Sequence, residues 1–566
     1  MKKKYLSLYH LITGIILLFT LSLAEAQEKL ATDIYLIRFT DKSQNRFENS
    51  HPEKFLSLRA IQRRIKQNIP FISNDLPVST VYVDSLKHLG FKILHESKWL
   101  NAVSVNVVDI QQFDKLKDIK FVVPYKLKSG LKSNDSPGIK FKSETTPVKL
   151  DPKTYYGPSF NQMAIHHGDY LHNRGFRGQG MLIAVIDAGF KNAQNMSSLD
   201  SLWDENRVKL VRDLILPDGN VFIQDPHGSE VLSVLAGLRP GHLVGSAPKA
   251  DYVLLRTEDA TEEKDSNGIT RYCEYPVEEF NWAIAAELAD SVGVDVISTS
   301  LGYSLFNDPQ LNHSYKDMNG RTTIISKAAG IASSKGMIVV VSAGNEGNKL
   351  WKYITAPADA DSILAVGAID ANNIIASFSS RGPTSDRRIK PDVVAVGQNT
   401  ILQQPDNEFV QGNGTSFSAP VIAGLTACLW QSCPNKTNMD IIGTIKQYAS
   451  QYYNPDTIKG FGSPDFRQSF YALNPDLFEY KDKLICSPNP FSTTIELQFE
   501  MIPEGKVQLS VFDIYGWKVI DKQIYVNSEI PNIISTNDLI SLAKGFYVIQ
   551  LHSGSKKLKT TIIKIE

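Results

Sequence analysis

The sequence of 566 residues contains little cysteine and no excess of charge of either sign. Four cysteines, at 273, 428, 433 and 486, are too few for a disulfide scaffold and lack metal-ligand spacing. We interpret Cys428 and Cys433 as core residues of an apolar helix. Lysine plus arginine equals aspartate plus glutamate at 60 each, so the charge balance gives no support to a nucleic-acid partner.

Long apolar segments are also scarce. The stretch Leu11–Leu23 follows Lys2, Lys3 and Lys4 and precedes small residues at positions 24 and 26. This order predicts a secretory signal peptide over residues 1–26. A membrane anchor is the weaker alternative, because the stretch contains Thr and Ser and is short for a span. No later segment is apolar enough to cross a bilayer, so we expect an exported, soluble protein.

Residues 27–130 alternate strand-like and helix-like segments, which predicts a small α+β domain. We expect strands at Tyr35–Phe39, Ala102–Val108 and Phe121–Tyr125, and helices at Lys54–Lys66 and Ile110–Leu116. A linker over residues 131–154 follows. Because its composition is rich in Lys, Ser, Gly and Pro, we expect it to be exposed and open to proteolysis.

Residues 155–475 have a different pattern, in which short, continuously apolar runs alternate with helix-like segments. This pattern favours an α/β fold with a doubly wound parallel sheet covered on both faces. The expected strands are Leu182–Ile186, Tyr252–Leu255, Val294–Ile297, Ile338–Val341 and Ile363–Val366. Residues 480–566 instead alternate apolar and polar side chains, which predicts a small all-β sandwich domain.

The stretch Gly412–Pro420 reads Gly-Asn-Gly-Thr-Ser-Phe-Ser-Ala-Pro and precedes the apolar run Val421–Trp430. Proline is tolerated in the first helical turn, and a run that is apolar on all sides predicts a buried helix. Ser416 is therefore expected at a helix N-terminus, where free N–H groups favour developing negative charge. Taken alone, this stretch is more typical of a Gly/Ser turn that caps a core helix than of a catalytic site.

Three further polar residues are expected near Ser416. Asp187 ends the first apolar strand, Asn345 follows another strand, and His227 precedes a helix-like stretch. Open α/β sheets place functional groups at the carboxyl ends of their strands. Each residue has a structural alternative, since Asp and Asn suit turns and His227 suits a helix start. In combination, in the order Asp, His, Asn, Ser with a glycine beside each, they favour catalysis.

These residue types suit acyl transfer through an acyl-enzyme intermediate. A serine hydroxyl needs a base, which His227 provides, and a carboxylate such as Asp187 holds the imidazole in the required tautomer. The tetrahedral oxyanion needs preorganised donors, here the Asn345 amide and the Ser416 N–H.

The order and wording of these segments resemble the subtilisin-like serine peptidases, over roughly Tyr155–Phe466. The segments Ser377–Pro383 and Lys390–Gly397 also resemble sequence motifs that are typical of this family. The resemblance implies a secreted serine endopeptidase that hydrolyses proteins or peptides and needs no cofactor for its chemistry. It also implies two substrate-binding segments, formed by Ser300, Leu301 and Gly302 and by Ser342, Ala343 and Gly344.

Two positions depart from the family pattern. Asp187 is followed by Ala188 where Thr or Ser is common, and His227 is followed by Gly-Ser-Glu rather than Gly-Thr-His. Both changes lie beside the expected chemistry, so they concern local packing more than the reaction.

The two flanking regions carry weaker resemblances. Residues 27–130 resemble the subtilase pro-domain, which implies a zymogen whose pro-domain acts as an intramolecular inhibitor. The tail segments Ser487–Phe491, Val511–Gly516 and Lys544–Gln550 resemble the C-terminal sorting domains of type IX-secreted proteins. This resemblance implies contact with a secretion machinery and a secreted or cell-surface location.

Two other functions compete with this interpretation. A non-catalytic surface binding protein on a peptidase scaffold is one, because fold does not imply function. A serine esterase is another, but Ser416 lacks the Gly-x-Ser-x-Gly setting. The acidic stretch Glu258–Asp265 has oxygen ligands for structural calcium, although such loops are often only solvated, and we assign no metal.

Overall fold

The computed structural model falls into two compact units, Met1–Phe466 and Arg467–Glu566, which are described separately. The expected signal peptide and most of the expected linker lie outside the residues it describes. Within the described residues, no helix has both the length and the apolar character needed to span a membrane. The described residues are 29–31, 33–123, 145–147, 155–216, 219–260, 262–264, 270–272, 274–474, 484–493, 495–499, 505–526, 532–536, 539–553 and 556–565.

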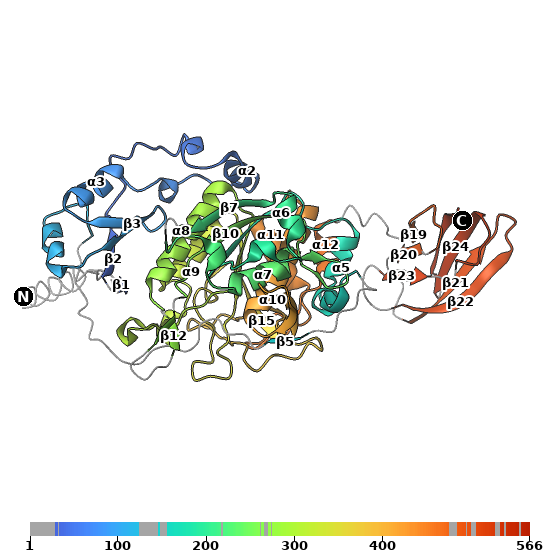
Figure 1. The fold of residues 1–566 in the computed structure, drawn as a ribbon. Helices are drawn as coiled ribbons and strands as arrows, with labels where there is room; N and C mark the ends of the chain where they lie inside the picture. Colours follow the sequence, from blue (N-terminus) through green and yellow to red (C-terminus); the bar gives the residue numbers. More distant parts are fainter. Residues whose placement is uncertain are drawn as a thin grey trace, which may run out of the picture. The chain divides into compact units, whose positions relative to one another are not determined.

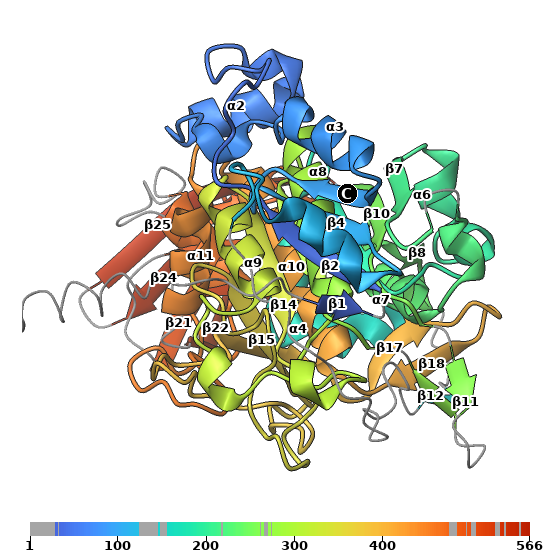
Figure 2. The same ribbon diagram turned by 90° about the vertical axis from the view of Figure 1, so that its left-hand side faces the viewer.

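The N-terminal domain is an antiparallel sheet in the order β1–β2–β4–β3, packed against helices (Figures 1 and 2). One face of the sheet and α3 enclose a core that contains Ile37, Val83, Val103 and Phe113. The strand expected at Phe121–Tyr125 is wrong for its described part, because only Val122 pairs, in a single bridge. The elements are β1 (Lys29–Ala31), β2 (Ile34–Arg38), α2 (Leu58–Lys66), α3 (Thr80–His88), β3 (Lys92–Ser97), β4 (Ala102–Asn106) and 3₁₀ helices at Pro52–Lys54, Ser73–Asp75 and Ile110–Leu116.

A seven-stranded parallel sheet in the order β16–β15–β14–β13–β6–β10–β7 forms the centre of the first unit. The strands β6, β14, β15 and β16 are nearly all Val, Ile, Leu and Ala because both faces of the sheet are buried there, whereas the edge strand β7 is partly exposed and carries charged residues. The predicted α/β, doubly wound fold is therefore confirmed. The strands are β6 (Leu182–Asp187), β7 (Val208–Asp213), β10 (Asp251–Arg256), β13 (Val296–Thr299), β14 (Ile338–Ser342), β15 (Leu364–Ile369) and β16 (Val393–Val396).

Helices cover both faces of this sheet (Figure 1). The helices α8 (Val277–Val292) and α9 (Ile324–Ser334) share one large apolar cluster with the sheet. The helices α7 (His227–Ala236) and α10 (Thr415–Ser432) contact the sheet outside that cluster and pack on each other. Smaller helices of the first unit are α4 (Phe160–Ala164), α5 (Gly168–Asn173), α6 (Asp200–Asp204) and α11 (Asn438–Gln447). The residues of α12 (Phe466–Leu473), apart from the first, belong to the second unit.

Three small sheets complete the first unit. One joins β17 (Thr400–Gln403), β18 (Phe409–Gly412) and β5 (Thr145–Pro147), a strand within the expected linker. The other two are hairpins: β8 (Leu238–Arg239) pairs with β9 (Leu243–Val244), and β11 (Glu262–Lys264) pairs with β12 (Thr270–Tyr272).

The second unit contains two antiparallel sheets, β19–β20–β23 and β22–β21–β24–β25. Val507, Leu509 and Val511 alternate along β21 and are fully buried in the core of this unit. The predicted all-β sandwich is therefore confirmed. Its strands are β19 (Leu484–Ser487), β20 (Ile495–Phe499), β21 (Gly505–Phe512), β22 (Lys518–Val526), β23 (Asn532–Thr536), β24 (Gly545–Ser553) and β25 (Lys556–Lys564).

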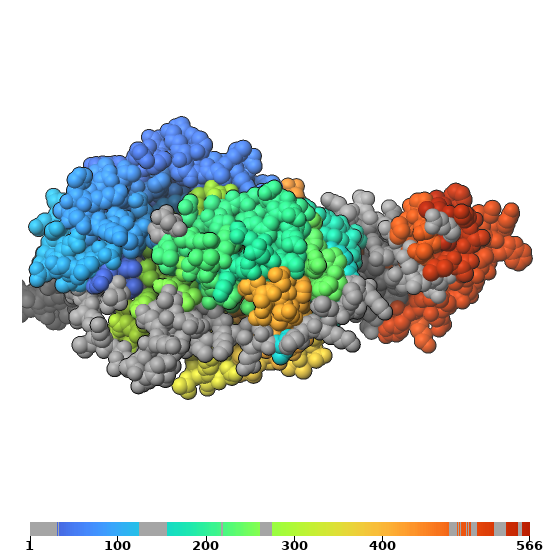
Figure 3. Space-filling model, viewed as in Figure 1, coloured from blue at the N-terminus to red at the C-terminus, as the bar shows by residue number. Residues whose placement is uncertain are grey.

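The N-terminal domain lies directly against the rest of the first unit (Figure 3). Leu36 and Ala102 of its sheet pack on Phe280 of α8 and Ile324 of α9. The carboxylate of Glu287, in α8, accepts hydrogen bonds from the backbone N–H groups of Lys98 (2.8 Å) and Trp99 (3.0 Å). An apolar contact and backbone hydrogen bonds therefore join the two domains.

A buried ionic network adds to this interface. Asp290 of α8, fully buried, contacts Arg63 (2.5 Å), Arg64 (2.8 Å) and Lys98 (3.5 Å) of the N-terminal domain. Asp75, also fully buried, contacts Arg64 (3.0 Å) and Lys335 beyond α9 (2.8 Å). Since each carboxylate faces more than one cation, removing either leaves positive charge in an apolar surrounding.

We expect Asp290→Ala to lower the free energy of unfolding of the intact chain by about 3–5 kcal/mol, because it removes the carboxylate shared by three buried cations. Urea unfolding followed by circular dichroism measures this change. The matched control is Asp114→Ala, whose partner Lys117 is exposed, with an expected loss below about 1 kcal/mol. Equal losses in the two variants would contradict the role of the network.

Candidate active site

Asp187 and His227 meet at the carboxyl edge of the parallel sheet. Asp187 is the last residue of β6 and fully buried, and His227 is the first residue of α7. His227 Nδ1 lies 2.6 Å from Asp187 Oδ1. Gly228 permits this approach, because a Cβ there would lie 2.3 Å from the Gly189 carbonyl oxygen. The short contact fixes the tautomer of His227 with its proton on Nδ1.

The backbone around this pair is also fixed. The N–H of His227 donates to Asp225 (2.8 Å), and the N–H of Ala188 donates to Asp187 Oδ1 (2.8 Å). Asp187 Oδ2 is buried and has no hydrogen-bond partner among the described residues. Ala188 supplies no hydroxyl there, so this departure from the family pattern leaves one carboxylate oxygen without a donor in the described part of the chain.

The charge around His227 favours its protonated form. Burial by itself lowers the pKa of His227, but the Asp187 carboxylate, their hydrogen bond, and the carboxylates of Asp225 and Glu230 outweigh it and raise the pKa to about 9. Burial raises the pKa of Glu230 to about 7, although His227 and Gln404 act in the opposite direction. These carboxylates therefore favour the imidazolium form of His227.

Ser416 is the second residue of α10, and the helix begins earlier than Pro420 suggested. Pro420 lies inside α10 and has no N–H, so it cannot bond the carbonyl oxygen of Ser416 four residues before it. The hydroxyl of Ser300 donates to that oxygen instead, at 2.8 Å. Sequence reasoning assigned Ser300 to substrate binding and missed this contact, which ties the end of β13 to the start of α10.

Asn345 also meets the start of α10. Its side-chain oxygen accepts from the N–H (2.9 Å) and the hydroxyl (3.0 Å) of Thr415, and that hydroxyl accepts from the Gly344 N–H at 3.2 Å. With its oxygen held in this way, the Asn345 amide presents its NH₂ group as the free donor. Thr415 was missed in the sequence, although its place beside Ser416 was the available signal.

The four expected catalytic residues therefore gather around the N-terminus of α10. Ser416 and Asn345 are linked through Thr415, and the ring centroid of His227 lies 6.2 Å from that of Phe417, which follows Ser416. Asp187 reaches the group through His227. A hydroxyl, an imidazole, a carboxylate and an amide in this arrangement can carry out nucleophilic acyl transfer.

The two expected substrate-binding segments follow β13 and β14. Ser300, Leu301, Ser342 and Ala343 are buried, whereas Gly302 is exposed. Thr355 lies between the two segments, a residue that sequence reasoning missed. A Cβ on Gly302 would lie 2.2 Å from Thr355 Oγ1, and one on Gly344 would lie 2.9 Å from it.

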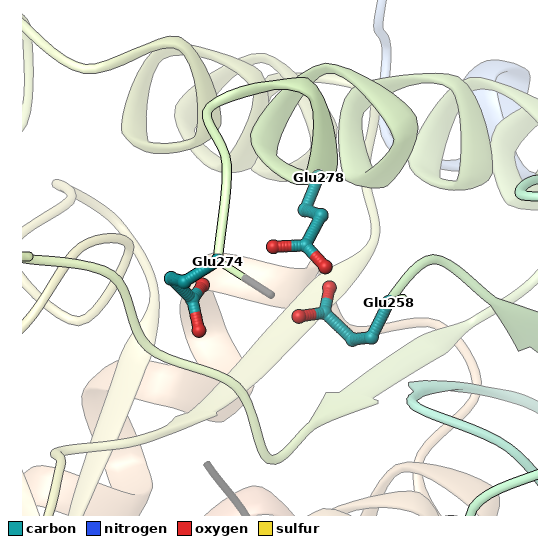
Figure 4. Close-up of side chains that lie close together, drawn as sticks. All are labelled: Glu258, Glu274 and Glu278. Atoms are coloured by element: carbon teal, nitrogen blue, oxygen red, sulfur yellow. The ribbon is translucent and has the colours of Figure 1, made fainter. Parts of the chain in front are cut away.

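Three buried carboxylates, of Glu258, Glu274 and Glu278, converge near β10 and the start of α8 (Figure 4). One carboxylate oxygen from each of the three residues lies within 4.8 Å of the corresponding oxygens of the other two. Carboxylate oxygens are suitable ligands for a hard cation such as calcium. Both oxygens of Glu278 already accept backbone N–H groups, and Glu258 accepts the hydroxyl of Tyr303. Side chains at 261–265, within the stretch Glu258–Asp265, lie outside the described residues, and the cluster carries no metal assignment.

A model of the subtilase family matches residues 178–462, which is half of the chain and includes all four expected catalytic residues. This chain is a subtilase. A model of the Bacteroidota peptidase S8 propeptide matches residues 34–142, and one of a secretion-system C-terminal sorting domain matches residues 487–565. The expected family, propeptide and type IX sorting domain are confirmed, and the sorting domain indicates a secreted or cell-surface subtilase.

Individual relatives agree with the family. Subtilisin E of Bacillus subtilis is 29% identical over 289 residues, which cover 50% of this chain and 64% of the relative. The thermostable alkaline protease of Halalkalibacterium halodurans is 26% identical over 368 residues, covering 64% and 88%. A subtilisin-like protease of Arabidopsis thaliana is 26% identical over 346 residues, covering 56% and 29%. The subtilase therefore spans less than two thirds of the length of the first and third of these relatives.

We expect His227 to titrate with a midpoint near pH 9 rather than at its ordinary 6.5, because the facing carboxylates stabilise the imidazolium. In Asp187→Asn that stabilisation is lost while burial remains, so the midpoint should fall. The Cε1 proton resonance in NMR measures it, and the missing signal in His227→Gln assigns it. A wild-type midpoint at or below 6.5 would refute the expected shift.

Proposed function

We propose that this subtilase is a secreted serine endopeptidase that hydrolyses proteins or peptides through Asp187, His227 and Ser416. The observation that carries the proposal is the 2.6 Å contact between buried Asp187 and His227 beside the N-terminus of the helix that begins with Thr415 and Ser416. A buried carboxylate bonded to Nδ1 leaves Nε2 of the imidazole as the base.

The proposed reaction has two halves. Neutral His227 takes the proton of Ser416, whose Oγ bonds to the carbonyl carbon of the substrate, and the peptide C–N bond breaks as His227 returns the proton to the leaving amine. In the second half, water gives a proton to His227 while its oxygen bonds to the acyl carbon. The ester C–O bond then breaks as His227 returns the proton to Ser416 Oγ, which releases the carboxylic acid product. Asp187 stabilises the imidazolium that forms in each half.

Two donors are proposed for the oxyanion of the tetrahedral intermediate. The Ser416 N–H lies in the first turn of α10, where it has no partner within the helix and the helix dipole favours negative charge. The second donor is the NH₂ group of Asn345, whose oxygen Thr415 holds at 2.9 Å. Donors that are already oriented need no rearrangement when charge develops, which is why such sites accelerate acyl transfer.

The flanking domains receive separate roles in the proposal. The N-terminal domain, which covers α8 and α9, acts as an intramolecular inhibitor until the linker is cut, so the protein is a zymogen. The second unit is the address for a secretion machinery. The proposed domain limits are 27–130 for the propeptide, 131–154 for the linker, 155–475 for the peptidase and 480–566 for the sorting domain, after a signal peptide over 1–26.

A non-catalytic binding protein on the same scaffold is the competing function. Such a scaffold can lose any catalytic group without loss of binding. Here all four groups meet at one helix N-terminus, and Thr415 and Ser300 support two of them by hydrogen bonds. Burying polar groups lowers the stability of a fold unless they are hydrogen-bonded. A buried and hydrogen-bonded set of all four groups therefore favours catalysis over binding alone.

Covalent labelling by an organophosphorus serine reagent tests the function. We expect stoichiometric labelling of the native processed chain, none in Ser416→Ala, and a kcat on a peptide substrate that falls about 10²–10³-fold in Asn345→Ala with KM little changed. Denatured wild-type chain serves as the unlabelled control. Native chain that is neither labelled nor active on casein would exclude the peptidase function.

A second prediction concerns substrate choice at Thr355. Since its hydroxyl lies where a side chain on Gly302 or Gly344 would otherwise fit, Thr355→Gly should enlarge the space between the two proposed substrate-binding segments. We expect kcat/KM for a substrate with Phe before the scissile bond to rise about 10-fold relative to one with Ala, because each added buried methylene contributes about 1 kcal/mol. Thr355→Ser is the control, with an unchanged ratio. An unchanged ratio in Thr355→Gly would remove Thr355 from the specificity pocket.

A further inference from the structure

A cavity of about 510 Å³ lies between the N-terminal domain and the peptidase domain. This volume is within the range of small-molecule sites, roughly 300–1,000 Å³. Its described lining includes none of the four residues proposed for catalysis. The cavity is therefore a separate feature of the molecule, and its walls indicate what it can hold.

The helix α2 forms the wall on the side of the N-terminal domain. Arg59, Gln62, Arg63 and Lys66 line the cavity, and their spacing of three, one and three residues places them on one face of the helix. Ile65 also lines it and has 65% of its surface exposed. This wall is mostly cationic, with an apolar side chain at its edge.

The wall on the side of the peptidase domain is largely apolar. Met181, Trp430 and Pro434 line it together with Lys436. The indole N–H of Trp430 donates to the carbonyl oxygen of Lys436, at 2.9 Å. Because this bond holds the ring against the loop that follows α10, the apolar surface exists before any ligand enters.

The two walls are joined by the side chain of Gln67, which follows α2 and lines the same cavity. Its NH₂ group donates to the carbonyl oxygen of Gly336 (2.9 Å), and its oxygen accepts the N–H of Asn438 (2.9 Å). Both partners belong to the peptidase domain. The cavity thus has a fixed width, which lowers the entropy cost of binding.

The lining carries more positive than negative charge. Arg59 contacts Asp295, and Arg63 contacts a buried carboxylate of α8. Lys66 and Lys436 form no ion pair within the part of the chain that the structure describes. Two ammonium groups therefore line the cavity without a carboxylate of their own, beside an apolar wall.

We propose that this cavity binds a small carboxylate that carries an apolar group. Lys66 and Lys436 bind the carboxylate, and Met181, Trp430 and Pro434 contact the apolar part. An inorganic anion would leave the apolar wall uncovered, and a neutral apolar molecule would leave both ammonium groups without a counter-charge. A fatty acid and the C-terminal end of a short peptide share the required chemistry.

The position of the cavity gives such a ligand an effect on the zymogen. Since α2 supplies one wall and the peptidase domain the other, the complete site exists only while the two domains are associated. A ligand that binds one state of an equilibrium shifts the equilibrium toward that state. The carboxylate therefore favours the form in which the N-terminal domain stays on α8 and α9.

Direct binding is the first test. Isothermal titration calorimetry is done on the full Ser416→Ala chain, in which the proposed reaction cannot separate the domains. We expect octanoate or N-acetyl-leucyl-phenylalanine to bind with a dissociation constant of about 1 mM or lower, and the tighter of the two identifies the source. The corresponding amides should bind about fivefold more weakly or worse, because they lack the charge. Absence of saturable binding of both acids, or equal binding of acids and amides, overturns the proposal.

The contribution of both walls is the second test. We expect Lys66→Gln and Lys436→Gln each to weaken binding of the tighter acid about three- to fivefold, as for other partly exposed ion pairs. Lys120→Gln and Lys316→Gln, which change one exposed lysine in each domain outside the described lining, are the controls and should leave the affinity unchanged. Wild-type affinity in either cavity variant means that the site is not shared by the two domains, which overturns the proposal.

A charge placed inside the cavity is the third test. Ile65→Glu introduces a carboxylate into the lining, whereas Leu58→Glu introduces one on the same helix outside the described lining. Both side chains are mostly exposed, at 65% and 70%, so neither change disturbs the core. We expect Ile65→Glu to weaken acid binding about fivefold or more through repulsion, and Leu58→Glu to leave it unchanged. Equal affinities of these two variants contradict the site. All three tests use a chain without its nucleophile, so their outcome is independent of the proposed peptidase function.

Discussion

The burial of the N-terminus of α10 against the carboxyl edge of the sheet is the constraint on which the rest of the site depends. A helix this apolar has to be buried, yet its first turn carries free N–H groups that need polar partners. Asn345 and Ser300 provide polar contacts at this point, one through Thr415 and one through the carbonyl oxygen of Ser416. The partners that satisfy the helix end are also the groups that orient Ser416.

Proline inside this helix has a consequence for the reaction. Pro420 frees the Ser416 carbonyl oxygen, and Ser300 then binds it from the end of the neighbouring strand. The nucleophile is thereby connected to the segment proposed to bind substrate. A buried polar group without a partner costs stability, so the Ser300 hydroxyl contributes to the fold as well as to the position of Ser416.

The carboxylates around His227 control its charge. Asp187 orients the imidazole through a hydrogen bond, while Asp225 and Glu230 add negative charge nearby and raise its pKa further. Glu230 stands where the family pattern more often has a histidine, so this subtilase replaces a residue that can be positive by one that can be negative. The change favours the imidazolium that forms in the proposed reaction.

The sequence alone determined the fold class and named the four residues that are proposed for catalysis. The periodicity of apolar residues predicts strands and helices. The four residues Asp, His, Asn and Ser, each beside a glycine, indicate nucleophilic acyl transfer. Contacts between distant segments depended on tertiary structure, because no local pattern encodes them. The Ser300 hydroxyl on the Ser416 carbonyl, Thr355 beside Gly302, Asp290 among three cations and β5 on β18 each join residues more than forty positions apart. Only the packing of the sheet and its helices brings them together.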